Sequence, residues 1–93
     1  MIVGTCTVVL HIPDSGSLKA KRFVLRRLKD RIRNKFNVSV AEVDDFDLWQ
    51  KATIAVAVVS RNGQFADKVI SNVLRMIESE RGFVVIHIET ELR

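Results

Sequence analysis

The chain has 93 residues, of which 47% are hydrophobic and 28% are charged, and its formal net charge is +4 at pH 7. This length allows one domain with a two-layer core, and this composition excludes collagen-like, low-complexity and disordered chains. The sequence holds one cysteine and no apolar run near the roughly 20 residues that a membrane-spanning helix needs. We therefore expect one domain over residues 1–93, in the cytoplasm, without a disulfide or a membrane partner.

The first predicted element is a strand over residues 2–12, in which apolar and polar positions alternate. One face of this strand is expected to be buried and carries Gly4, Cys6, Val8, Leu10 and Ile12. Because Cys6 falls in this apolar run, we predict that its thiol is buried and inert.

A turn at residues 13–16 ends the strand, and Ser17 is suited to cap the helix that follows. The free N–H groups of this turn and the positive helix terminus, with Lys19 and Arg22 beside them, also favour an anion. We predict helix capping here, and name Ser15, Gly16 and Ser17 as candidate anion-binding residues. The turn does not match a phosphate-binding loop, because it lacks the spaced glycines followed by Lys and Ser or Thr.

The predicted helix over residues 17–36 is the most basic part of the chain. It holds nine of the fifteen Lys and Arg residues and one acid, for a net charge of +8, while the rest has six cations and ten acids. Its predicted buried stripe is Leu18, Leu25, Leu28, Ile32 and Phe36, with Val24 beside it. Charge this concentrated is typical of a surface that meets a polyanion.

Spacings of three and four residues place five cations in one stripe along a flank of this helix. The stripe spans roughly 20 Å and could contact several phosphates. Phe23 is predicted to be exposed between cations, where it could stack on an unpaired base or pack in a protein interface. An acidic protein surface or plain solvation are the alternatives for the cations. The candidate nucleic-acid-binding residues are Lys19, Arg22, Arg26, Lys29 and Arg33 in the stripe, with Arg27 and Phe23.

The remaining pattern predicts strands over residues 37–43, 51–60 and 83–91 and a second helix over residues 64–79. The order β-α-β-β-α-β indicates an α+β, ferredoxin-like (split β-α-β) fold, with a four-stranded antiparallel sheet and two helices on one face. An acidic connection joins the second and third strands. We expect its carboxylates to be solvated or to attract the basic helix of a neighbouring subunit rather than bind a metal. Trp49 is predicted to plug the end of the sheet, and stacking on a base or anchoring an interface are its alternatives.

The second face of this sheet is predicted to be bare and rather apolar, and a bare apolar face favours a partner. We expect a homo-oligomer, such as a homodimer, to cover it. The residues predicted on this face are Thr5, Thr7, Val9, His11, Thr53, Ala55, Ala57, Val59, Val85, His87 and Glu89.

No catalytic arrangement is evident in the sequence. His11 and His87 have no thiol or acidic partner at ligand spacing, and no serine stands in a nucleophile elbow. The turn at residues 13–17 does not resemble the substrate loop of acylphosphatases, which share this fold. We therefore predict no catalytic residues, no metal site and no cofactor.

Three stretches of the chain together resemble the YlxP group of small bacterial proteins of unknown function. The resemblance covers essentially the whole chain and implies a ferredoxin-like fold. The genes of this group often lie near genes for translation initiation and ribosome maturation, which implies contact with RNA or the ribosome. The stretches are His11-Ile12-Pro13-Asp14-Ser15 with residues 17–22, Phe36 to Asp44, and Asp47-Leu48-Trp49-Gln50-Lys51-Ala52.

Two functions follow as expectations. The first is a non-enzymatic binding module whose basic first helix contacts the phosphates of RNA, alone or on the ribosome, with little sequence discrimination. The alternative is an oligomeric protein-interaction or ligand-sensing domain that uses the open sheet face.

Overall fold

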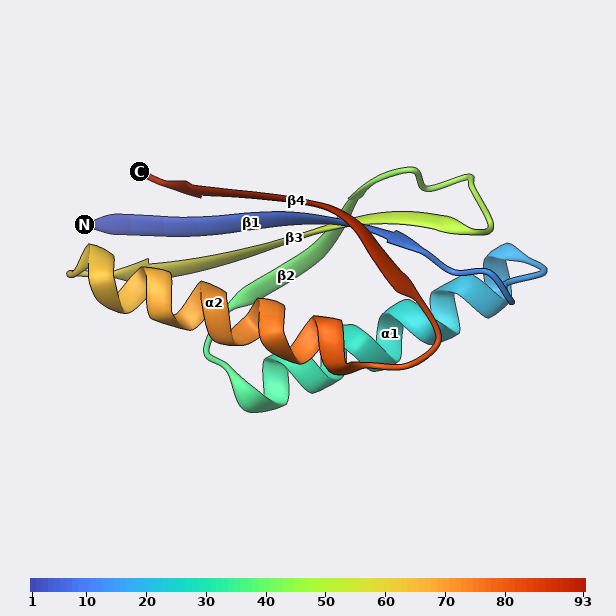
Figure 1. Ribbon diagram of the computed structural model, residues 1–93, viewed down its shortest axis with the longest axis horizontal. Helices are drawn as coiled ribbons and strands as arrows, with labels where there is room; N and C mark the ends of the chain where they lie inside the picture. Colours follow the sequence, from blue (N-terminus) through green and yellow to red (C-terminus); the bar gives the residue numbers. More distant parts are fainter.

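The computed structural model describes all residues, 1–93, and consists of a four-stranded antiparallel sheet with two helices packed on one face (Figure 1). The strand order is β2-β3-β1-β4, so the first and third strands are central, as the ferredoxin-like prediction requires. The elements are β1 (Ile2–His11), α1 (Leu18–Lys35), β2 (Ser39–Asp44), β3 (Lys51–Ser60), α2 (Gly63–Ser79) and β4 (Val84–Leu92).

The core lies between the sheet and the helices, and the period-two pattern of β1 determines its centre. Every residue predicted on the inner face of β1, from Gly4 to Ile12, is buried. Gly4 lets α2 approach closely, because an added Cβ would lie 3.2 Å from Ala66 Cβ and 3.3 Å from Val58 Cγ1. The predicted burial of Cys6 is confirmed, and burial raises the pKa of its thiol to about 11.

Both helices begin with capping side chains. Ser17 Oγ accepts the Ala20 N–H at 3.0 Å, and the Asn62 side chain accepts the N–H groups of Gln64 and Phe65. Within α1, Leu25, Leu28 and Ile32 are buried as predicted. A fourth buried residue of α1 is Lys21, which the hydrophobic pattern did not identify.

Strand β4 differs from the expected alternation because a bulge interrupts its pairing with β1 between Val9 and Leu10. Val9 pairs with His87, whereas Leu10 on the core side pairs with Val85. The prediction that Val85 lies on the open face is therefore wrong, since the extra residue of the bulge turns it toward the core. At its far end β4 stays paired with β1, and Val3 and Arg93 exchange two backbone hydrogen bonds of 2.9 Å there.

On the face of the sheet opposite the helices, some rows have small side chains on β2, β3 and β1 and a larger polar side chain on β4. One row pairs Ala41 with Ala55 and Thr7 with Glu89, and Ala55 lies opposite Thr7 on the central strands. Thr53 differs from its neighbours, because only 7% of it is exposed. Neither helix is long and apolar enough to cross a lipid bilayer.

Candidate nucleic-acid interface

The two flanks of α1 face different parts of the molecule. On one flank Arg33 donates a 3.0 Å hydrogen bond to the carbonyl oxygen of Val40, so this flank lies along the edge strand β2. On the other flank Arg31 binds both carboxylate oxygens of Glu80 at 2.7 Å, so this flank faces the end of α2. The cationic stripe of Lys19, Arg22, Arg26, Lys29 and Arg33, called the ridge below, belongs to the β2 flank because Arg33 is one of its members.

Most of the ridge has no internal counter-ion. Four of its five cations, all except Arg33, have no carboxylate within 4.0 Å, and three of those four are exposed, while Lys29 is half-buried. Arg33 has only a 3.8 Å contact to Asp30, and both side chains are at least half exposed. Such an exposed pair contributes little stabilisation. The ridge therefore keeps a positive potential that the protein does not neutralise itself.

Arg27, also predicted at this surface, does not join the ridge. It lines a small cavity of about 80 Å³ between α1 and the turn that leads to β4, together with Arg31, Glu80 and Arg81. The sequence places Arg27 one residue from Arg26, but one residue on a helix is a rotation of about 100°. A single partner that contacts both the ridge and Arg27 would have to cover the solvent-facing side of α1.

Phe23 lies on that outward side, and 64% of it is exposed, so its predicted exposure is confirmed. Its helical neighbours at three and four residues include Lys19, Arg26 and Arg27. The structure thus brings an aromatic ring and cations together, as a surface for unpaired bases would require. Stacking on a base and packing against a protein both stay predictions for this ring.

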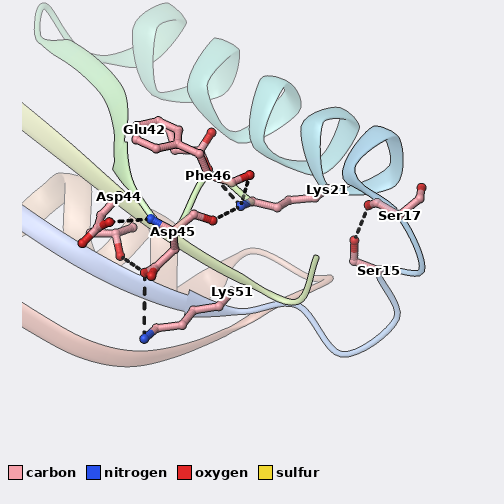
Figure 2. A network of polar contacts seen from close by, with 9 residues as sticks. Ser15, Ser17, Lys21, Glu42, Asp44, Asp45, Phe46 and Lys51 are labelled. Atoms are coloured by element: carbon pink, nitrogen blue, oxygen red, sulfur yellow. Dashed lines mark hydrogen bonds and ion pairs between the residues drawn. The ribbon is translucent and has the colours of Figure 1, made fainter. Parts of the chain in front are cut away.

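Lys21 has a different role from the other cations of α1. Only 1% of it is exposed, and its Nζ lies 3.0 Å from Glu42 Oε2 on β2. The ammonium also donates to the backbone carbonyl oxygens of Asp45 at 2.7 Å and Phe46 at 3.5 Å (Figure 2). The charge of Lys21 is therefore neutralised within the protein, and Lys21 has a structural role. It is the one member of the basic segment whose charge the fold buries.

Two residues hold the β2–β3 loop (residues 45–50) in place. Lys21 connects it to the helix layer and Asp45 connects it to the sheet. Asp45 takes a left-handed backbone conformation with φ of 62°, and its carboxylate accepts a 2.6 Å hydrogen bond from Thr53. Lys51 Nζ lies 3.9 Å from the same oxygen (Figure 2). Because Asp45 reaches over the open face, it accounts for the burial of Thr53 there.

Trp49 in this loop does not plug the sheet, and this prediction is wrong. More than half of Trp49 is exposed, as is more than half of Phe46. Hydrogen bonds to its backbone hold the loop in place, so neither ring has to be buried in the core to fix it. Their aromatic character was visible in the sequence, but no pattern in the sequence indicated that both rings point away from the core.

The turn before α1 is used mainly for capping. Ser15 is buried, and its hydroxyl donates a 3.1 Å hydrogen bond to the Ser17 carbonyl oxygen (Figure 2). The Ser17 hydroxyl caps the helix. Gly16 is exposed. Anion binding at Ser15, Gly16 and Ser17 stays a prediction, with the two hydroxyl groups already engaged in the fold.

The remaining titratable groups are dispersed. No three His, Cys, Asp or Glu side chains converge on a position that could hold a metal ion. The acids at the end of β2 instead contact the protein, since Glu42 pairs with Lys21 and Asp44 accepts the Asp45 N–H. His87 lies 3.0 Å from Glu89 on the exposed edge strand β4.

The fold and this basic helix define a small ferredoxin-like domain with an uncompensated cationic edge. A family model described as "Protein of unknown function (DUF503)" matches residues 3–90 of the chain. The "Uncharacterized protein YlxP" of Bacillus subtilis (strain 168) is 40% identical over 74 residues, which covers 80% of this chain and 78% of that protein. The chain belongs to the DUF503 family, and the predicted resemblance to the YlxP group is confirmed.

Proposed function

We propose that this protein is a non-enzymatic, cytoplasmic binding module that contacts RNA, alone or on the ribosome, through the ridge of α1. The observation that supports this proposal is the lack of internal counter-ions for Lys19, Arg22, Arg26 and Lys29. Guanidinium and ammonium groups spaced along a helix can neutralise several phosphates, and the RNA then releases the counter-ions condensed on it. Phosphate contacts of this kind give affinity with little sequence discrimination.

The like charges of the ridge also favour an anionic partner. Neighbours at three and four residues repel one another by roughly 0.2–0.5 kcal/mol per pair, and a bound polyanion removes that repulsion. An acidic protein could do the same, so the test must compare partners. We expect RNA to bind more tightly than an acidic polypeptide of equal charge, because the ridge meets regularly spaced phosphates.

The test is a triple substitution of Lys19, Arg22 and Arg26 to Glu, with affinity for a structured RNA measured by fluorescence anisotropy. We expect at least a tenfold loss of affinity. The matched control changes Arg61, Lys68 and Arg75 to Glu, because these exposed residues lie off α1 and the change in net charge is the same. Equal losses in the two variants would show that only overall charge matters, and would refute a site on the ridge.

Salt dependence provides a second measurement on the unmodified protein. Neutralisation of four phosphates lowers affinity by roughly 100-fold between about 50 and about 200 mM salt. We expect a slope of this size, reduced in the ridge variant and unchanged in the control variant. Affinity that ignores salt in this range would contradict the proposal.

The open sheet face supports a second candidate function, self-association or ligand sensing. Val59 on this face is 67% exposed, and a shallow hollow of about 220 Å³ is lined by Thr5, Ala41, Ala55 and Ala57 among others. A second copy would cover these small apolar side chains. We expect sedimentation to give a dimer, and Ala55→Arg to convert it to a monomer. A strict monomer at micromolar concentration would exclude self-association through this face.

A further inference from the structure

The β2–β3 loop carries three large apolar side chains that the fold leaves exposed. Phe46 is 56% exposed, Leu48 is 47% exposed, and Trp49, the only tryptophan of the chain, is 55% exposed. Three such residues within four positions are more than the scattered apolar residues of an ordinary surface. A patch of this kind indicates a contact site.

The backbone of this loop is fixed although its side chains are free. Lys21 donates to the carbonyl oxygens of Asp45 and Phe46, and the Leu48 N–H donates to the Asp45 carbonyl oxygen at 3.1 Å. At the far end, the Gln50 side chain donates to the Pro13 carbonyl oxygen at 3.1 Å, and the Ile12 N–H donates to the Gln50 carbonyl oxygen at 2.8 Å. Folding has already ordered the loop, so a partner that binds it loses little further entropy.

Lys21 also determines where the loop lies relative to the ridge. Its Nζ reaches the loop backbone from α1, one residue before Arg22 and two after Lys19. The loop and the start of α1 lie toward the same end of the molecule (Figure 1). The backbone of the loop therefore lies beside the N-terminal part of α1, the helix that carries the ridge, where phosphates are proposed to bind.

We propose that Phe46 and Trp49 stack on unpaired bases of the RNA whose phosphates contact the ridge. This inference rests on the proposed function and names its ligand class: an RNA with single-stranded nucleotides beside a paired segment. Aromatic faces bind any base by stacking, while cations follow the backbone, and sites for single-stranded nucleic acid combine the two. Lys21 is a positioning residue in this site, because it holds the loop and does not touch the RNA.

Asp47 favours RNA over a lipid surface as the partner of this loop. Asp47 is exposed and lies between Phe46 and Leu48 in the sequence. Insertion of the loop into the apolar part of a membrane would remove this carboxylate from water without a partner. A base instead carries N–H donors on its edge, and a carboxylate can accept them.

The experiment compares a hairpin RNA that has a single-stranded tail with a blunt hairpin of equal phosphate count. We expect the tailed RNA to quench the fluorescence of Trp49 and to bind at least tenfold more tightly. We expect the double substitution Phe46→Ala and Trp49→Ala, measured by anisotropy of labelled RNA, to abolish this preference. The matched control is Phe65→Ala, because Phe65 is 58% exposed on α2, away from the loop.

Phe46→Ala alone keeps the fluorophore and the loop backbone, so it separates stacking from misfolding. It should reduce the preference for the tailed RNA while circular dichroism stays native. Equal, salt-dependent binding of both hairpins without quenching would overturn the stacking site and leave the proposed function standing. Absence of binding to either hairpin would overturn both.

Two further outcomes would assign the loop to another partner and overturn the inference. One is a blue shift of Trp49 emission with phosphatidylserine vesicles and no response to RNA. The other is a drop in sedimented mass when Trp49 becomes Ala, with RNA affinity unchanged, which would place the loop in an interface between two copies.

Discussion

Lys21 shows how much the neighbours of a side chain decide its role. Its position in the sequence, among eight other cations of one helix, indicates a solvated or phosphate-binding group. Its actual partners are Glu42 and two carbonyl groups, and those carbonyls are 24 and 25 residues away in the sequence. No helical periodicity reports contacts at that range. A cation removed from water this completely needs these partners, because an unpaired buried charge is costly.

We predict that Lys21→Met destabilises the fold by about 3 kcal/mol, because it leaves Glu42 without its counter-ion and two carbonyl groups without a donor. Urea unfolding followed by circular dichroism measures the change. In the double variant Lys21→Met with Glu42→Leu, part of this loss should return, since no charge is left unpaired. A double variant no more stable than Lys21→Met would show that the pair itself is not the cause.

The raised pKa of Cys6 predicts a pH effect in the alkaline range. The thiol titrates near 9.0 when unfolded and at about 11 in the fold, so the folded state holds its proton longer. Stability from this group is full below pH 9.0 and falls as the pH rises to about 11. Urea unfolding of the unmodified protein and of Cys6→Ala should therefore diverge in this range. Parallel curves would show that the thiol is not responsible.

At the scale of elements, alternation and helical spacing were sufficient for the order and type of all six elements, but not for the two faces of β4. Thus β1 buries Cys6, Val8 and Leu10 on one face, and α1 buries Leu25 and Leu28. The bulge between Val9 and Leu10 was not predictable, because Val84, Val85 and Ile86 form an apolar run that occupies both faces of the strand. Without a polar residue to mark the solvent side, the pattern cannot show a change of register.

The start of α1 depends on one hydroxyl group. Ser17→Ala removes the acceptor of the Ala20 N–H, and we expect a loss of about 1 kcal/mol in unfolding free energy. Ser71→Ala is the matched control, because Ser71 is exposed within α2 and makes no such bond. Thermal unfolding of both variants checks the prediction, and equal melting temperatures would contradict it.

The close approach of β1 and α2 depends on the missing side chain of Gly4. Gly4→Val should destabilise the protein by about 2 kcal/mol, because its branched side chain must displace Ala66 on the helix. Gly16→Val is the comparison, since no atom lies within 4 Å of a Cβ at Gly16. Chemical denaturation would disprove the expectation if both glycine variants were equally stable.

For the whole molecule, the main feature is the separation of charge. The net charge of +4 is the sum of a strongly positive α1 and a negative remainder, and most ridge cations have no partner. This distribution was readable from the sequence, and so was the candidate ridge. The loop beside it was not, because the exposure of Trp49 depends on how Lys21 and Asp45 hold the chain across the sheet edge.

Self-repulsion on the ridge predicts that salt stabilises the free protein. Screening should raise the unfolding free energy by about 0.5 kcal/mol between low and moderate salt, because four like-charge pairs weaken. The variant with Lys19, Arg22 and Arg26 changed to Gln should show a smaller increase. Calorimetry at several salt concentrations measures both proteins, and an identical response would show that the ridge is not the source.

The central place of β1 has a consequence for the time course of folding. β1 pairs with β3 on one side and with β4 on the other, and β4 begins at Val84. During synthesis the second edge of β1 therefore stays unpaired until nearly the whole domain has emerged. Pairing over such sequence distances is slow and leaves a sticky strand edge open to intermolecular association. A chain stalled after α2 should consequently be an early substrate for chaperones.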